Sequence, residues 1–178
     1  MSIAYNKLSK TLMKEALSKL EAELKTPIQL IIGGGGAMVL AYEFPLATSD
    51  IDGIPKGFDL SDIEKQIKIV ARELDITPDW LNPYYSAYTH VLPSDYNKRL
   101  RTVFSKKNLT ALALGPEDLL IMKCFARRAK DMGHIHVLLK QKPDLELVTS
   151  HLEKLIEKRI KGAKEALDFL EELLDQVI

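Results

Sequence analysis

Hydrophobic residues recur at helical spacing near the N-terminus and then give way to short apolar runs. Apolar positions three or four residues apart predict an amphipathic helix over residues 9–24. The run Ile28–Ile32 is short and mostly apolar, which is typical of a buried strand. Residues 37–44 are predicted to form a helix that ends at Pro45. Residues 50–54 alternate polar and apolar side chains, as a strand does.

Mixed elements continue beyond residue 60 and give way to helices after residue 115. The predicted elements are a helix, an edge strand, a long irregular segment and a β-hairpin, over residues 60–74, 75–82, 83–99 and 100–114. Gly115 and Pro116 mark the sharpest boundary, because almost every later segment has helical spacing, beginning with a helix over residues 116–130. The sequence therefore predicts an α+β fold. A mixed β-sheet flanked by helices would occupy residues 1–115, and a C-terminal helical region packed on this core would occupy residues 116–178.

Composition excludes several classes of protein. Lys plus Arg and Asp plus Glu both total 25, and the zero net charge argues against a non-specific nucleic-acid binder. The single cysteine, Cys124, excludes an internal disulfide and a cysteine-based zinc site. No apolar run approaches the roughly 18 residues of a membrane span. The segment from Met1 to Lys7 lacks a signal-peptide pattern, so we expect a cytoplasmic protein without membrane contact.

Four consecutive glycines, Gly33–Gly36, separate the buried strand from the helix that follows it. Glycine lets a backbone turn sharply and approach a ligand closely, and the N-terminus of a helix favours anions. The run is not a P-loop, because no Gly-Lys-Ser/Thr follows it. Taken alone it predicts either a phosphate-binding turn or a tight strand-to-helix turn without a ligand.

Two carboxylates follow the glycine run, and their spacing would place them on one face of a strand. Asp50 and Asp52 stand at i and i+2. Mg²⁺ is commonly held by one or two carboxylates together with substrate phosphates and waters. Taken alone the pair is more often surface or turn chemistry than a metal site, but its spacing from Gly36 makes the combination more specific.

The two motifs together carry a resemblance to a known superfamily. Ile31–Leu40 followed by Thr48–Asp52 resembles the first two motifs of the DNA polymerase β-like nucleotidyltransferase superfamily. The form Gly-Gly-x-Ala with Thr/Ser-x-Asp-Ile-Asp is similar to small bacterial nucleotidyltransferase-fold proteins related to the abortive-infection (AbiEii-type) toxins. Pro116–Lys123 with Lys130 and Asp131 resembles a later motif of that group. The resemblance extends over residues 28–140.

This resemblance implies a role for each matching residue. The nucleotide phosphates would bind a set of small and basic residues: Gly34, Gly35, Gly36, Ser49 and Lys123. Asp50 and Asp52 would bind Mg²⁺ or Mn²⁺, and Asp131 would complete the side of the site that contains Lys123. A third carboxylate would help to activate the acceptor hydroxyl; Asp79 is the best positional candidate, with Asp75 and Asp95 as alternatives.

Two positions depart from the family pattern. Gly36 and Ala37 stand where many members carry a small hydroxyl residue, and His134 stands where close relatives often carry a second aspartate. The expected function is transfer of a nucleoside monophosphate from an NTP to an unidentified hydroxyl of RNA, protein or a small molecule. The alternative is a catalytically inactive binding or regulatory protein of a toxin–antitoxin pair, bound to a cognate antitoxin or to a second copy of the chain.

Other aromatic and basic residues leave their roles open. Four aromatic residues could stack on a base or pack in the core: Trp80, Tyr84, Tyr85 and Tyr88. Four basic residues could line a groove for an RNA acceptor or form an exposed hairpin: Arg99, Arg101, Lys106 and Lys107. The amphipathic segment 143–178 could cover the core of the protein itself or bind a partner helix.

Overall fold

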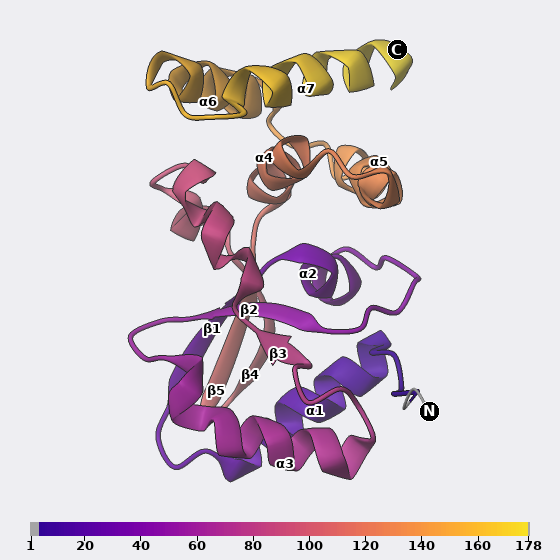
Figure 1. The fold of residues 1–178 in the computed structure, drawn as a ribbon, viewed down its shortest axis with the longest axis vertical. Coiled ribbons are helices and arrows are strands. Elements are labelled where there is room, and N and C mark those ends of the chain that lie inside the picture. The colour runs from indigo at the N-terminus through magenta and orange to yellow at the C-terminus, as the bar shows by residue number, and fades with distance from the viewer. Residues whose placement is uncertain (1–3, 178) are drawn as a thin grey trace. The chain divides into compact units, whose positions relative to one another are not determined.

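The computed structural model describes residues 4–177 of the chain (Figure 1). The α-helices are α1 (Lys10–Glu23), α2 (Gly34–Ala41), α3 (Glu64–Leu74), α4 (Pro116–Ala126), α5 (Met132–Lys140), α6 (Leu145–Glu157) and α7 (Ala163–Val177). The strands are β1 (Ile28–Ile32), β2 (Ile51–Pro55), β3 (Leu81–Asn82), β4 (Arg101–Lys106) and β5 (Leu109–Ala113). Short 3₁₀ helices occupy Leu60–Ile63, Tyr84–Val91, Tyr96–Arg99 and Ala129–Asp131. The prediction that Met1–Lys7 is not a signal peptide falls partly on residues 1–3, which lie outside the described range.

The strands form one mixed sheet in the order β3-β2-β1-β5-β4. β1 pairs parallel with β5 and antiparallel with β2, while β2 pairs parallel with β3 and β4 pairs antiparallel with β5. The predicted hairpin and the apolar central strand are both present, and the α+β prediction is confirmed. Because β1 is the central strand, the glycine run that follows it begins in the middle of the sheet.

Two compact units make up the chain. The first contains the residues up to Ala87 together with Leu100–Leu114, and so holds the whole sheet. The second contains Tyr88–Arg99 and the chain from Gly115 onward, and so holds the last four helices. None of the helices in the described part of the chain has the length and hydrophobicity needed to cross a bilayer.

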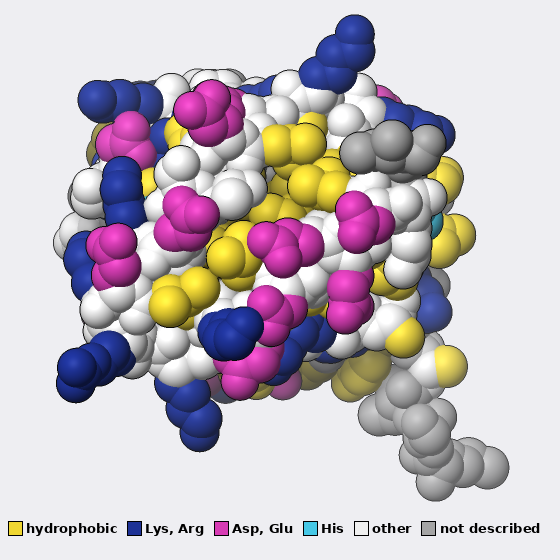
Figure 2. Space-filling model, turned by 90° about the horizontal axis from the view of Figure 1, so that it is seen from above, with side chains coloured by type: hydrophobic (Ala, Val, Ile, Leu, Met, Phe, Trp, Pro, Cys, Tyr) yellow, Lys and Arg dark blue, Asp and Glu magenta, His cyan; other side chains and the backbone are white. Residues whose placement is uncertain are grey.

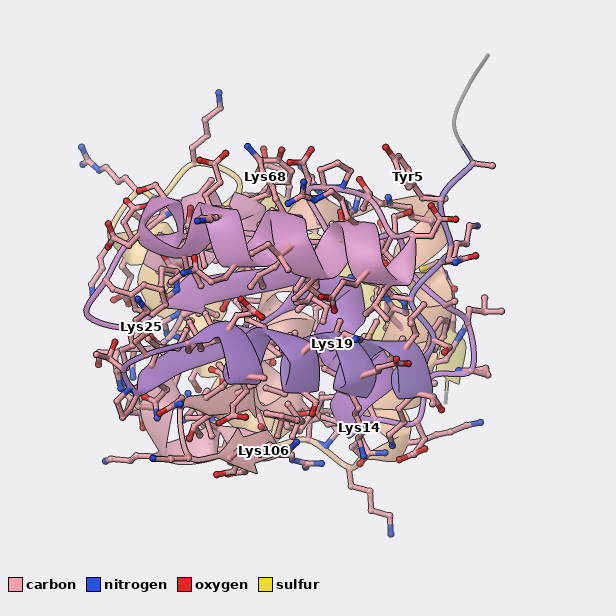
Figure 3. All side chains as sticks on the ribbon, turned by 90° about the horizontal axis from the view of Figure 1, so that it is seen from below. Tyr5, Lys14, Lys19, Lys25, Lys68 and Lys106 are labelled. Carbon is pink, nitrogen blue, oxygen red and sulfur yellow. The ribbon has the colours of Figure 1, made fainter. Side chains whose placement is uncertain are left out.

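In the first unit, α1 and α3 lie side by side (Figure 3). Lys19 of α1 and Glu73 of α3 form an ion pair at 2.9 Å, and Lys68 pairs with Glu64 at 2.5 Å. Lys106, which is labelled on the same side, donates a hydrogen bond to the hydroxyl of Ser18. Several of the basic side chains on this side therefore already have partners within the unit.

In the second unit, α4 is the central helix and packs against α5, α6 and α7. Four consecutive apolar residues of α4 are buried: Leu119, Leu120, Ile121 and Met122. A helix that buries apolar residues all round is surrounded by other elements. α6 and α7 also pack on each other, and the side of the molecule that they present carries acidic side chains with apolar ones between them (Figure 2).

The helix predicted over residues 116–130 is shorter than expected. α4 ends at Ala126, because Arg127 adopts a left-handed conformation with φ of 47° and caps the helix. Lys130 and Asp131 lie instead on the short 3₁₀ helix that follows. The predicted end of the helix at residue 130 was wrong for this reason.

A buried ion pair fixes the start of α4. The guanidinium of Arg99 donates two hydrogen bonds to Asp118, from Nε to Oδ2 at 2.9 Å and from Nη2 to Oδ1 at 2.8 Å. The Asp118 side chain is fully buried, and hydrogen bonding to Asp118 raises the pKa of Arg99 above its usual value. The pair joins the 3₁₀ helix Tyr96–Arg99 to the first turn of α4.

Removing Arg99 should therefore destabilise the second unit. In Arg99→Ala the Asp118 carboxylate stays buried without its bidentate partner, and breaking a buried pair in this way costs about 3–5 kcal/mol. Urea unfolding followed by circular dichroism would measure the change. The control Lys164→Ala, which removes an exposed pair with Asp168, should cost less than about 1 kcal/mol. Equal effects of the two variants would contradict the structural role of Arg99.

Candidate functional site

The glycine run forms the first turn of α2. Gly33 is the N-cap, and its carbonyl accepts a hydrogen bond from the backbone N–H of Ala37 at 3.1 Å. The helix therefore begins at Gly34, three residues before the predicted start at residue 37. The N–H groups of a first helical turn have no acceptor within the helix. The turn thus presents backbone donors at the end of β1.

Gly34 and Asp52 are in close contact. Gly34 has a φ of +55°, and a Cβ atom placed on it would approach Oδ2 of Asp52 closer than 3.0 Å. The backbone N–H of Gly33 also donates to the carbonyl oxygen of Asp52 at 3.0 Å. Glycine is favoured here because of the positive φ and because a larger residue would have to displace the Asp52 carboxylate. The two sequence motifs therefore meet in space, as their spacing in the sequence suggested.

The next two glycines pack against the segment before Asp52. A Cβ atom on Gly35 would lie 3.2 Å from Oγ1 of Thr48, and one on Gly36 would lie 3.3 Å from the Cα atom of Ile51. Such distances are shorter than most real Cβ contacts. The absence of side chains on the first turn of α2 therefore allows the turn to lie directly against the start of β2.

Asp50 and Asp52 do not both lie on the strand. β2 begins at Ile51, whose N–H donates to the carbonyl of Trp80 at 2.6 Å, and Asp50 is the residue before it. The prediction that both aspartates share one strand face is therefore corrected: Asp52 is in the strand and Asp50 is in the preceding loop. Both side chains are half-buried. Among residues 4–177, no group of three or more His, Cys, Asp or Glu side chains is arranged to hold a metal ion.

Asp50 lines a pocket of about 370 Å³ within the first unit. Polar and aromatic residues from three separate segments form its wall: Tyr5, Asn6, Lys7, Ser49, Asp50, Thr77, Asp79 and Tyr84. Three of these, Ser49, Asp50 and Asp79, are predicted site residues, and the structure brings them together. The pocket combines carboxylates, hydroxyls, an amide and one lysine, so its lining is polar and carries both signs of charge.

The N-terminal segment, Tyr5–Lys7, also lines this pocket, which the sequence did not predict. Leu8 and Thr48 exchange two backbone hydrogen bonds, at 2.7 and 3.1 Å, and the N–H of Asn6 donates to the carbonyl of Asp75 at 3.0 Å. These bonds hold Tyr5 and Lys7 beside the loop that carries Asp50. Backbone pairing over this separation leaves no pattern in the side chains, so the sequence gives no signal for it.

Asp79 lies on a turn and not on a strand. β3 contains only Leu81 and Asn82, and the N–H of Trp80 donates to the carbonyl of Thr77 at 3.0 Å, closing a turn around Asp79. The predicted strand over residues 75–82 was therefore too long, although the Asp79 side chain is exposed and lines the pocket.

The two alternatives to Asp79 have other places. Asp75 caps α3 in a left-handed conformation, and Asp95 forms an ion pair with Arg99 at 3.1 Å in the second unit. Neither residue lines the pocket that contains Asp50 and Asp79.

Two of the four aromatic candidates are structural. Trp80 is fully buried and donates its indole N–H to the carbonyl of Ile67 at 3.0 Å. Tyr85 is buried, donates its hydroxyl to the carbonyl of Ile31 at 2.6 Å, and packs its ring against Gly33. Tyr84 is 69% exposed and is the one of the four that lines the pocket with Asp50. The core thus takes Trp80 and Tyr85, while Tyr84 is available to a ligand.

Lys123 and Asp131 meet in the second unit. Nζ of Lys123 donates to Oδ1 of Asp131 at 2.6 Å, and both side chains are at most 4% exposed. Arg128 donates from Nε to Oδ2 of the same carboxylate at 2.7 Å. Burial opposes ionisation of Asp131, but hydrogen bonds from His134, Arg128 and Lys123 outweigh it and hold the pKa of Asp131 below its usual value. Lys123 is thus held by a buried carboxylate.

Neutralising Asp131 should destabilise the second unit. In Asp131→Asn the buried ammonium of Lys123 loses its counter-charge, and about 3–5 kcal/mol of stability should be lost at pH 7. The exposed Asp168, which pairs with Lys164, supplies the matched control, and Asp168→Asn should change stability by about 0.5 kcal/mol or less. Urea titration of both variants measures the difference.

The same carboxylate should give the stability a pH dependence. Because the pKa of Asp131 is lowered on folding, its contribution is fully present above the unfolded-state pKa of about 3.9 and is lost as the pH falls further. Between pH 7 and pH 3 the natural chain should therefore lose more stability than Asp131→Asn. Urea unfolding at a series of pH values measures this difference. If the stability of both chains fell equally between pH 7 and pH 3, Asp131 would not be held ionised by its neighbours.

Most of the basic residues that could line a groove for RNA make contacts within their own unit. Arg99 binds Asp118, and the guanidinium of Arg101 lies 4.8 Å from the centre of the Tyr42 ring. Lys106 donates to Ser18 at 2.6 Å. Three of the four basic side chains therefore have structural partners.

Comparison with known proteins identifies the family. A family model described as "Nucleotidyltransferase of unknown function (DUF6036)" matches residues 9–170, nearly the whole chain. No curated protein and no solved structure matches the chain. The family match confirms the nucleotidyltransferase part of the resemblance, while the finer likeness to the abortive-infection toxins stays a prediction.

Proposed function

The chain belongs to this nucleotidyltransferase family, and we propose that it transfers a nucleoside monophosphate from an NTP to a hydroxyl acceptor with the help of Mg²⁺ or Mn²⁺. The proposal rests on the contact between Gly34 and the Asp52 carboxylate. It supports a site in which backbone donors for phosphate and an oxygen ligand for a cation lie side by side.

The donor set suits a magnesium ion that also binds the substrate. Asp50 and Asp52 supply hard oxygen ligands, and Mg²⁺ normally combines one or two carboxylates with phosphate oxygens and waters. The close packing of Gly34 and Asp52 leaves the carboxylate at the phosphate-binding turn. A bound ion would neutralise the triphosphate and polarise the α-phosphoryl group. With only two protein carboxylates, the substrate phosphates would have to complete the coordination.

The residues of the chain would position the reaction. The first turn of α2, with Gly34, Gly35 and Gly36, would bind the β- and γ-phosphates through its N–H groups, and Ser49 would bind a phosphate oxygen beside Asp50. The acceptor oxygen would form a bond to the α-phosphorus while the bond to the β-phosphate oxygen breaks, releasing pyrophosphate. Asp79, on the same pocket wall as Asp50, would take the proton of the acceptor hydroxyl.

Lys123 and Asp131 would act as a coupled pair. The phosphate contact that the resemblance implies for Lys123 stays a prediction, and for it Nζ would have to exchange its hydrogen bond with Asp131 for one with a phosphate oxygen. Arg128 also binds the carboxylate of Asp131, so that carboxylate would keep a partner after the exchange.

One observation favours a second function, nucleotide binding without transfer. Lys123 is buried and tied to Asp131, so the phosphate contact proposed for it needs a rearrangement. In a regulatory protein, such as one half of a toxin–antitoxin pair, nucleotide binding at the glycine turn would suffice. Transfer releases pyrophosphate and binding alone does not, so an assay for pyrophosphate separates the two functions.

Thermal unfolding in the presence of nucleotide tests the proposal. A ligand at a hundredfold excess over its Kd should stabilise the chain by about 2.7 kcal/mol. Each of the four NTPs would be added with MgCl₂ and, as the matched control, with EDTA. We expect a magnesium-dependent rise in the melting temperature with at least one NTP. No rise with any NTP would contradict both functions proposed above.

A further inference from the structure

A second pocket lies wholly within the second unit. Its volume is about 530 Å³, and one face of α6 forms one wall while residues 90–95 and Ile160 form the rest. Five residues of α6 and its C-cap line it, at positions three or four apart: Leu147, Ser150, His151, Lys154, Leu155 and the C-cap Lys158. Side chains at this spacing share one helix face. The volume is in the range of small-molecule sites, roughly 300–1,000 Å³.

The geometry of the wall opposite α6 is fixed by a hydrogen bond. Nε2 of His151 lies 2.7 Å from the carbonyl oxygen of Val91. A carbonyl can only accept, so the ring of His151 donates through Nε2. This bond holds α6 to the end of the 3₁₀ helix Tyr84–Val91 at the edge of the pocket. The pocket is therefore held by a specific contact as well as by apolar packing.

The polar groups of this pocket favour an anion. Lys154 and Lys158 are exposed on the same helix face, and among the described residues neither ammonium lies within ion-pair distance of a carboxylate. The hydroxyls of Ser94 and Ser150 add hydrogen-bond donors. The one carboxylate of the lining, Asp95, is already paired with Arg99 at 3.1 Å. Two lysines and two hydroxyl residues therefore line a pocket whose one acidic lining residue is already paired with Arg99.

The apolar groups favour a ring system next to that anion. Leu92 and Leu155 are buried and Pro93 lies between Leu92 and Ser94, so apolar carbon atoms line part of the pocket. An extended polyanion is a poor fit for this unit, because the exposed face of α7 is acidic (Figure 2): Glu165, Asp168, Glu171, Glu172 and Asp175. These carboxylates would repel a continuing phosphate backbone. A single small ligand fits the charges better.

We propose that this pocket binds a mononucleotide-like ligand, with a phosphate group between Lys154 and Lys158 and a flat ring on the apolar surface of Leu92 and Leu155. The site would be separate from the transfer chemistry assigned to Asp50 and Asp52, since all of its lining residues belong to the second unit. It gives the chain a second place for a phosphorylated small molecule, as an effector or as a small acceptor.

Calorimetric titration with AMP tests this site. The chain used would be Asp52→Asn in EDTA, so that metal-dependent binding at the glycine turn makes no contribution to the signal and the result does not depend on the transfer reaction. Phosphate and adenosine, titrated separately, represent the two halves of AMP. We expect AMP to bind with a lower Kd than either half. Equal affinity for adenosine would overturn the role of the lysines, and equal affinity for phosphate would overturn the role of the apolar surface.

A charge-matched pair of variants locates the binding. Lys154→Ala with Lys158→Ala should weaken AMP binding about tenfold or more, because both phosphate partners are removed. Lys140→Ala with Lys161→Ala removes two exposed lysines of the same unit outside the pocket and should leave the affinity unchanged. All four lysines are exposed, so neither pair of substitutions should disturb folding. Saturable binding that both pairs weaken equally, or no AMP binding at millimolar concentration, would overturn the proposal.

Discussion

The Asp52→Asn variant is expected to lose nucleotidyl transfer by about 10³-fold or more, since a metal ion supplies several kcal/mol of transition-state stabilisation and each 1.36 kcal/mol is worth a factor of ten. Asparagine has nearly the same shape as aspartate, so the contact with Gly34 should be kept while the negative charge is lost. The melting temperature without nucleotide should change little. The magnesium-dependent stabilisation by NTP should disappear together with the activity.

The matched control is an aspartate of similar chemistry far along the chain. Asp175 is exposed in the last turn of α7, and Asp175→Asn removes one negative charge outside the first unit. It should retain both the transfer rate and the magnesium-dependent shift. Full transfer activity in Asp52→Asn would contradict the assignment of Asp52 as a metal ligand, whatever the control shows.

The Gly34→Ala variant should separate the function of the glycine turn from its contribution to stability. Two effects act at this position: a φ of +55°, which an L-residue adopts at a cost of about 1–2 kcal/mol, and the contact of the new Cβ with Oδ2 of Asp52. The carboxylate ends a short side chain and would be displaced. We therefore expect a moderate loss of stability together with a loss of transfer comparable to that of Asp52→Asn.

Gly57 supplies the control for the first effect alone. It also has a positive φ, of 82°, but nothing lies within 4 Å of a Cβ atom placed on it. Gly57→Ala should lose a similar amount of stability, about 1–2 kcal/mol, and should keep full activity. Unfolding curves and initial rates measured on both variants give the comparison. If Gly34→Ala kept its activity, the proximity of Asp52 to the turn would have no functional meaning.

The regular elements followed well from the periodicity of the sequence. α1 and α7 have clear helical spacing, and the apolar run Ile28–Ile32 became the central strand β1. The boundaries failed where a local conformation outweighed the pattern. Glycine is a poor helix former, so the predicted start of α2 lies after the glycine run. In the structure the run forms the first turn of the helix and packs against Thr48 and Ile51.

The parts of the candidate site differed in how far the sequence could predict them. The glycine run directly follows β1, and Asp52 lies on the adjacent strand β2 a short distance along the chain, so their contact could be anticipated. The contribution of Tyr5 and Lys7 to the pocket depends on backbone hydrogen bonds between Leu8 and Thr48. No pattern of side chains in the sequence predicts these bonds. Long-range backbone pairing of this kind becomes visible only in the folded chain.

The ion pairs of the second unit show a similar limit. Asp118 looks like an ordinary acidic residue at a helix start, where it would favour the helix dipole. In the structure its carboxylate is fully buried and binds Arg99, nineteen residues earlier in the chain. The residue types and their local preferences can be read from the chain, but only the burial of Asp118 shows that Arg99 stabilises the fold and does not line an open groove.

Transfer of label from an NTP tests directly whether the chain attaches a nucleoside monophosphate to an acceptor. The natural chain would be incubated with MgCl₂, total cellular RNA and protein, and each NTP labelled in turn at the α- or the γ-phosphate, with Asp52→Asn and EDTA as controls. We expect that label from the α-position becomes attached to an acceptor, that label from the γ-position is released with pyrophosphate, and that both controls abolish transfer. Attachment of γ-label, or α-label transfer that persists in Asp52→Asn, would contradict the proposed function.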